Sequence, residues 1–250
     1  MTKRTHRLES IESSTEYQYL ADSLVLDHYS TPKDVLDLLK ASFFGLHNES
    51  LNAWSHFMGG TYFLLESFKQ TQLAPFVYCV CATFCFLSSG LCHFTTGFGE
   101  RAYDMFGRLD YAGISVLTWG TTTSVSLQVF EPEDPRLKTI VAWTTAIAGI
   151  TLSSAVLNVR SKVIRVTLYA LAGSCTLIPL VIRREHPFAQ RYVKETFISM
   201  LLCYLIGLTF YLWRIPERWF PGKFDLIFSS HHFWHVAVWL ASFIHFQSLV

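Results

Sequence analysis

Long apolar runs separated by short charged stretches dominate the chain after residue 50. Each run is long enough, or nearly so, to cross the hydrocarbon core of a bilayer as a helix of about 20 residues. The seven runs are Leu51–Phe68, Phe76–Phe98, Tyr111–Phe130, Thr139–Val159, Val166–Ile182, Thr196–Trp213 and Leu226–Val250. No period of about 20–50 residues links them, so the pattern predicts an all-α integral membrane protein, a seven-helix bundle and not a repeat array.

The first 50 residues follow a different pattern. Residues 1–30 are polar with few periodic apolar positions, which predicts a mobile tail. The sequence then predicts a short amphipathic helix within residues 31–50, with Thr31 as its cap and Pro32 in its first position. Such a helix could lie at the membrane interface or pack against loops as a soluble helix does. Residues 51–250 form the predicted seven-transmembrane domain.

Composition supports a membrane protein and narrows its partners. Apolar residues make up 51% of the chain and charged residues 16%, against about 25% charged in a typical soluble domain. The formal net charge is +1 and no basic stripe is present, which argues against nucleic acid as a partner. The six cysteines all lie inside apolar runs, so we expect buried thiols and not a disulfide framework.

The positive charges predict an orientation. Seven spans put the two termini on opposite sides, and 13 of the 20 lysines and arginines fall on the side of the N-terminus. Because cytosolic loops are enriched in these residues, we expect a cytosolic N-terminus and an extracellular or lumenal C-terminus. The membrane is then the plasma membrane or an endomembrane.

The last apolar run opens with candidate chemistry. His231 and His235 are four residues apart, so their rings share one face of a helix. From Leu226 to Val250 there is no Asp, Glu, Lys or Arg, and polar side chains inside such a span are a functional hypothesis by default. An imidazole pair at this spacing could supply two ligands of one metal ion. His232 points away from the pair, and we interpret it and His245 as structural.

The predicted topology brings further polar groups to a similar depth. His93 ends the second run, Asp110 stands at the start of the third, and the histidine pair starts the seventh, all toward the cytosolic side. Ser89 lies one turn before His93. Three neutral imidazoles and one open position make a catalytic zinc site, with Asp110 as a group that holds water. Alternatively, each histidine bonds a backbone carbonyl or reaches the interface.

Four segments carry a resemblance to a known family. They are Asn48–His56 (NE-x-x-N-x-W-x-H), Ser89–His93 (S-x-x-x-H), Leu109–Ile114 (LDY-x-GI) and Arg214–Asp225 (RIPER-x-x-PGKFD), the last followed by Ser230, His231 and His235 (SH-x-x-x-H). Together they resemble the progesterone and adipoQ receptor family, related to hemolysin III, and its adiponectin-receptor branch most. The resemblance covers about residues 41–250. His232 stands where family members often carry Gln, and Cys92 where an aromatic residue is common.

The resemblance implies a seven-helix receptor that holds zinc with His93, His231 and His235. Asp110 and Ser89 would lie beside the water, and hydrolysis of ceramide-type lipid amides in lipid-metabolic signalling is the implied activity. Expected partners are membrane lipids, a ceramide or other sphingolipid, a fatty acid, and an extracellular protein ligand. A non-enzymatic receptor with structural zinc is the alternative. A transporter or channel is a weaker one, because the sequence offers no paired broken helices.

Overall fold

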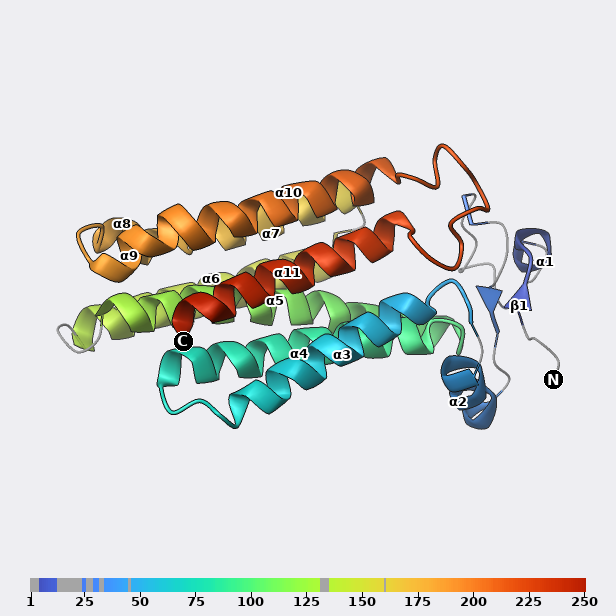
Figure 1. Ribbon diagram of the computed structural model, residues 1–250. Helices are drawn as coiled ribbons and strands as arrows, with labels where there is room; N and C mark the ends of the chain where they lie inside the picture. Colours follow the sequence, from blue (N-terminus) through green and yellow to red (C-terminus); the bar gives the residue numbers. More distant parts are fainter. Residues whose placement is uncertain are drawn as a thin grey trace. The chain divides into compact units, whose positions relative to one another are not determined.

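The apolar runs of the sequence are helical in the computed structural model, and the strands in its described part are two residues long (Figure 1). The structure describes residues 5–12, 24–25, 29–31, 34–44, 46–130, 135–159 and 161–250. The chain divides into two compact units. The first unit is Met1–Met58, Ser88–Leu109 and Cys203–Trp239, and the second is Gly59–Leu87, Asp110–Leu202 and Leu240–Val250.

The N-terminal region contains short elements that the polar sequence did not predict. Strand β1 (Thr5–His6) pairs antiparallel with β2 (Tyr29–Ser30), and α1 (Leu8–Glu12) follows β1. Burial of apolar side chains explains this local order, because Ile11 is 2% and Tyr29 1% exposed. Residues 1–4, 13–23 and 26–28 of the predicted mobile tail lie outside the described residues, so its mobility stays a prediction.

The predicted amphipathic helix exists, but it begins later than expected. Helix α2 spans Val35–Phe44, and the Oδ1 atom of Asp34 accepts the N–H of Asp37 at 2.8 Å. Asp34 therefore provides the cap in place of Thr31, because its carboxylate reaches the N–H three residues on. Pro32 lies outside the described residues. The ring of Phe43 contacts those of Trp54 and Phe94, at centroid distances of 5.2 and 6.1 Å.

Long helices follow in the order of the seven apolar runs. They are α3 (Ser50–Ser67), α4 (Leu73–Thr95), α5 (Glu100–Phe130), α6 (Pro135–Leu157), α7 (Lys162–Ser174) with α8 (Leu177–Ile182), α9 (Pro187–Arg191) with the π-helix η2 (Tyr192–Phe197) and α10 (Ile198–Trp213), and α11 (Ser230–Leu249). The all-α class is confirmed. Several runs differ in detail. Helix α5 begins at Glu100, well before Tyr111, the sixth helical segment begins at Pro187, before Thr196, and the fifth run is broken between α7 and α8. Pro179 explains the break, because its ring would clash with the carbonyl of Cys175 in a continuous helix.

Four segments in the described part of the chain are long and apolar enough to cross a membrane. They are Leu73–Thr95, Thr139–Leu157, Lys162–Ile182 and Pro187–Trp213. Helices α3, α5 and α11 are long enough too, but histidines, an asparagine and many hydroxyl side chains lower their apolar character. That all seven helices cross the membrane therefore stays a prediction. The less apolar three include α11, which carries His231 and His235, and α5, which carries Asp110.

A buried polar network orders the second unit around His245. Its Nδ1 atom lies 2.6 Å from the Tyr192 hydroxyl and its Nε2 atom 2.9 Å from the Ser124 hydroxyl. Ser124 itself donates to the carbonyl of Thr121 at 2.9 Å, so Nε2–H donates to Ser124 and Nδ1 accepts from Tyr192. His245 is 0% exposed. Since both ring nitrogens are hydrogen-bonded, the structural interpretation of this histidine fits its surroundings.

The cysteines are free, as the sequence predicts, but Cys175 and Cys203 are only half-buried. All six are free, and four of them, Cys79, Cys81, Cys85 and Cys92, are buried. Cys81 also marks a close approach of α4 and α5 in the second unit, because a Cβ atom at Gly120 would lie 2.5 Å from its Cβ. Only a residue without a side chain fits at position 120.

We therefore expect Gly120→Ala to destabilise the protein by about 1–3 kcal/mol through overpacking, seen as a lower melting temperature in detergent. Gly107→Ala is the matched control, because it lies in the same helix and a Cβ atom there meets nothing within 4 Å. An unchanged melting temperature for Gly120→Ala would contradict the close approach of the two helices.

Candidate metal centre

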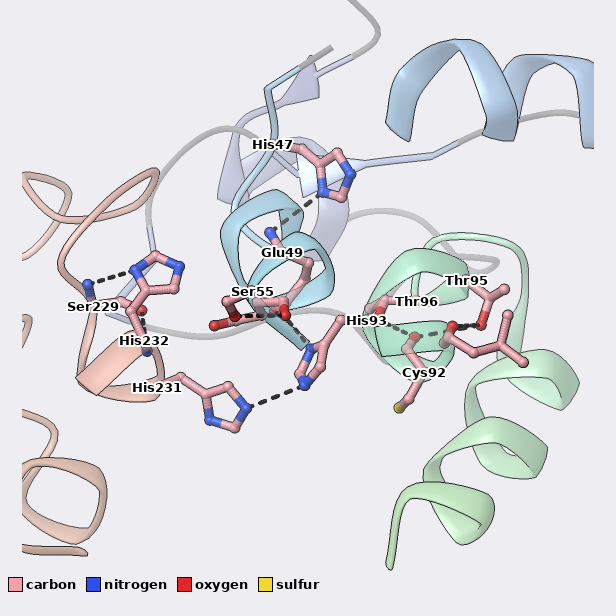
Figure 2. A network of polar contacts seen from close by, with 12 residues as sticks. His47, Glu49, Ser55, Cys92, His93, Thr95, Thr96, Ser229, His231 and His232 are labelled. Atoms are coloured by element: carbon pink, nitrogen blue, oxygen red, sulfur yellow. Dashed lines mark hydrogen bonds and ion pairs between the residues drawn. The ribbon is translucent and has the colours of Figure 1, made fainter. Parts of the chain in front are cut away.

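Three imidazoles from two helices converge in the first unit. His93 is on α4, and His231 and His235 are one turn apart on α11. Their candidate ligand atoms all lie within 4.8 Å of one another, and the two Nε2 atoms of His93 and His231 are 3.4 Å apart (Figure 2). The structure thus brings together the three histidines that the sequence predicts as ligands.

The donor set fits a divalent metal ion of the zinc type. His235 is 2% exposed, and its Nδ1 atom has no hydrogen-bond partner among the described residues. A buried ring nitrogen without a partner is unfavourable unless a ligand occupies it. Three neutral imidazoles are a known ligand set for zinc, which leaves a fourth tetrahedral position to be filled. Nothing in the structure identifies which metal binds.

A carboxylate orients the first of the three imidazoles. Nδ1 of His93 lies 2.8 Å from Oε2 of Glu49, the residue that precedes α3 (Figure 2). Because a carboxylate only accepts, the proton sits on Nδ1 and the lone pair of Nε2 faces His231. The pattern is that of metal-binding histidines, whose second ring nitrogen usually donates to a carboxylate or carbonyl.

Glu49 is itself held in place and kept ionised. The Nδ2 atom of Asn52 donates to the same Oε2 atom at 2.8 Å. Burial acts to raise the pKa of the Glu49 carboxyl, but the His93 hydrogen bond, the His93 and His231 imidazoles and the Asn52 amide together hold that pKa well below its usual range. The carboxylate is therefore the charged form that strengthens the hydrogen bond from His93.

The turn before α3 fixes the backbone of Glu49. The N–H of His47 donates to the Ser50 hydroxyl at 2.9 Å, and Nδ1 of His47 accepts the N–H of Glu49 at 3.3 Å. Burial lowers the pKa of the His47 imidazole, which favours the neutral ring that this contact requires. His47 and the Asn48–His56 motif that follows it thus form a scaffold, in which His47 sets the backbone and Asn52 the side chain of Glu49.

His232 has a structural role at the start of α11. Its Nδ1 atom accepts the N–H of Ser229 at 2.9 Å, and its own N–H lies 3.4 Å from the Ser229 hydroxyl (Figure 2). This reciprocal pair is a capping box with histidine at the position where Glu or Gln is usual. The imidazole therefore replaces the glutamine common at this position, and its Nδ1 atom is already used by the backbone.

Ser89 and Asp110 are the remaining predicted site residues, and their site roles stay predictions. Ser89 is on α4 in the first unit, 3% exposed and one turn before His93. Asp110 is half-buried on α5 and belongs to the second unit, so its part in the site stays a prediction. His56, on α3, adds a fourth imidazole, with its ring centroid 3.7 Å from that of His235.

Sequence reasoning missed the role of Glu49. The residue stood inside a recognised motif, but nothing in spacing alone links it to His93, which is 44 positions away. The available signal was a carboxylate placed just outside a span that itself contains Asn and His. An acid at such a depth needs a partner, and the histidines were the candidates.

The family can now be named from the whole chain. Residues 44–246 match the model of the haemolysin-III-related family. The chain belongs to that family. Over 259 residues this member is 28% identical to heptahelical transmembrane protein 1 of Arabidopsis thaliana, covering 92% of the chain and 77% of the relative.

Two animal relatives point in the same direction. Over 219 residues the chain is 27% identical to progestin and adipoQ receptor family member 3 of Mus musculus, covering 78% of the chain and 70% of the relative. Over 231 residues it is 28% identical to an adiponectin receptor protein of Drosophila melanogaster, covering 83% of the chain and 51% of the relative. The resemblance to the progesterone and adipoQ receptor family is confirmed, and the protein is an adiponectin-receptor-like, heptahelical-type membrane protein.

The Glu49 contact predicts a measurable effect on metal affinity. We expect Glu49→Gln to bind zinc about 10–100-fold more weakly than the wild type in a chelator competition, because His93 loses its charged acceptor. Glu66→Gln, near the far end of α3, should leave the affinity unchanged, since Glu66 pairs with the exposed Lys69. Equal affinities for the two variants would contradict an orienting role of Glu49.

The adjacent imidazoles of α11 should behave differently. His231→Ala should lose bound zinc, measured by elemental analysis after gel filtration, because the variant lacks one of three ligands. His232→Gln should keep it, since Gln at this position completes the same capping box. Loss of zinc from His232→Gln with retained helicity would show that this ring binds metal.

Proposed function

We propose that this family member spans the membrane seven times and uses an intramembrane zinc ion, held by His93, His231 and His235, to hydrolyse ceramide-type lipid amides. A signalling role in lipid metabolism would follow from that activity. The observation that carries the proposal is that three imidazole ligand atoms lie within 4.8 Å of one another. One of these rings, that of His93, is oriented by its hydrogen bond to the Glu49 carboxylate. A site of this kind, with an open position, is typical of zinc hydrolases.

The residues of the chain have separate tasks in this proposal. Zinc in a three-histidine site acts as a Lewis acid toward a carbonyl and brings the pKa of a water close to 7. Glu49 keeps the Nδ1–H tautomer of His93, so that Nε2 is available as a ligand. Asp110 would accept the proton of the attacking water, and Ser89 would donate a hydrogen bond beside His93. Hydrolysis then breaks the amide C–N bond and yields a fatty acid and an amine.

Location and partners follow from the proposed topology. The site lies near the cytosolic side, with the N-terminus in the cytosol and the C-terminus outside or in the lumen of the plasma membrane or an endomembrane. Membrane lipids reach it laterally, which suits a ceramide or other sphingolipid substrate and a fatty-acid product. We propose an extracellular protein ligand from the name of the adiponectin receptor relative.

A receptor in which zinc is purely structural is the second candidate. The polar cluster of the first unit joins three helices. Glu49 stands just before α3 and bonds to Asn52 on that helix, His93 lies on α4, and His231 lies on α11. A metal in this position would fasten those helices together, and its binding energy would add to the stability of the fold.

A hydrolysis assay on the purified protein separates the two candidates. We expect the wild type to release fatty acid from a labelled ceramide, and the double variant His93→Ala, His231→Ala to fall to the level of a protein-free control. His232→Gln serves as the matched histidine variant and should remain active. Hydrolysis retained by the double variant would exclude zinc chemistry. Zinc removal that lowers the melting temperature of a wild type without hydrolysis would support the structural candidate.

A further inference from the structure

Glu217 is a buried carboxylate in the connection between α10 and α11, where Asp225 is also 4% exposed. The segment between α10 and α11 exposes Trp219 by 63% and Phe220 by 47%, whereas Glu217 is 4% exposed. A local turn holds it, in which the N–H of Arg218 donates to the carbonyl of Arg214 at 2.8 Å. The side chain thus points inward from a loop whose neighbouring aromatic residues point outward.

The carboxylate of Glu217 binds the first residue of α11. Its Oε1 atom accepts the N–H of Ser230 at 2.7 Å and the Ser230 hydroxyl at 2.8 Å. The first N–H groups of a helix have no partner within the helix. Here the Ser229 hydroxyl faces the N–H of His232, so the capping box leaves the N–H of Ser230 to Glu217. Two bonds to a charged acceptor are stronger than neutral caps and fix where the helix starts.

The start of α11 matters because the ligands lie directly behind it. Ser230 precedes His231, and His235 follows one turn later, so the rotation of this first turn decides where both rings point. The site also lies at the end of a 20-residue helix whose N-terminus carries a partial positive charge. That charge opposes a cation nearby, and the carboxylate of Glu217 offsets it.

We propose that Glu217 is a positioning residue of the metal centre. It fixes the first turn of α11 and hence the directions of the His231 and His235 rings. It also lowers the positive potential that the helix end presents to a bound cation. The proposal rests on the metal site of the proposed function and adds a residue from outside the ligand set. Glu217 touches neither the metal nor the substrate, so its effect must appear in how the site binds an ion.

Cobalt binding tests this role without any measurement of activity. The full-length protein is purified in detergent, freed of metal and titrated with Co²⁺, and the visible absorption of the bound ion and its affinity against a chelator are recorded. We expect Glu217→Ala to bind Co²⁺ about 10–100-fold more weakly, with a reduced tetrahedral absorption band. Glu217→Gln keeps an acceptor but loses the charge, and should bind Co²⁺ about three- to tenfold more weakly.

The control is a cap on a helix that carries no ligand. Ser161 caps α7, since its side chain accepts the N–H of Ile164, and Ser161→Ala should keep the wild-type affinity and spectrum. Equal loss in Ser161→Ala and Glu217→Ala would reduce the effect to general stability and overturn the proposal. So would wild-type binding by Glu217→Ala. If that variant does not fold, Glu217→Gln decides, and wild-type affinity there overturns the proposal. A wild type that binds no Co²⁺ removes the metal site of the proposed function itself.

Discussion

The hydrogen bond between Glu49 and His93 is the contact on which the polar cluster of the first unit depends. It places the proton on Nδ1 of His93 and turns the Nε2 lone pair toward His231, 3.4 Å away. Two imidazole nitrogens at that separation share either a proton or a cation. The geometry of Asn52 and the turn at His47 serve this contact, because each removes a freedom that Glu49 would otherwise have.

Two histidines of α11 illustrate how surroundings separate a structural group from a candidate ligand. His245 and His235 are both almost fully buried on the same helix. His245 has hydrogen bonds at both ring nitrogens, from Tyr192 and to Ser124, so its ring has no capacity left for a ligand. His235 leaves Nδ1 without a hydrogen bond in the described structure and lies against three other imidazoles. In an apolar environment an unused nitrogen is costly, which favours a ligand role for His235 and not for His245.

Three demands act on the start of α11. It needs caps for its free N–H groups, it holds two imidazoles on one face, and it carries a partial positive charge near a candidate cation site. The capping box of Ser229 and His232 meets the first demand from within the helix, and Glu217 meets it from the preceding loop. Because Glu217 is an anion, the same contact also reduces the unfavourable potential. The three histidines near the start of α11 therefore have two different tasks. His231 and His235 are candidate metal ligands, and His232 caps the helix.

The helix class, the free cysteines and the family could all be read from the chain alone. These depend on local composition and on spacing within one helix, such as the four residues between His231 and His235. The start of α2 was misjudged because Thr31 and Asp34 are both good caps, and only the fold shows that Asp34 reaches the N–H of Asp37. Pro179 offered a local signal for the break before α8, since its ring acts on a carbonyl one turn earlier. The roles of Glu49 and Glu217 were decided by tertiary structure, because a carboxylate 44 residues from its imidazole, or 13 from its helix end, has no signature in periodicity. Spacing along one helix states which rings can face the same way, but only packing between segments determines which acceptor meets which donor.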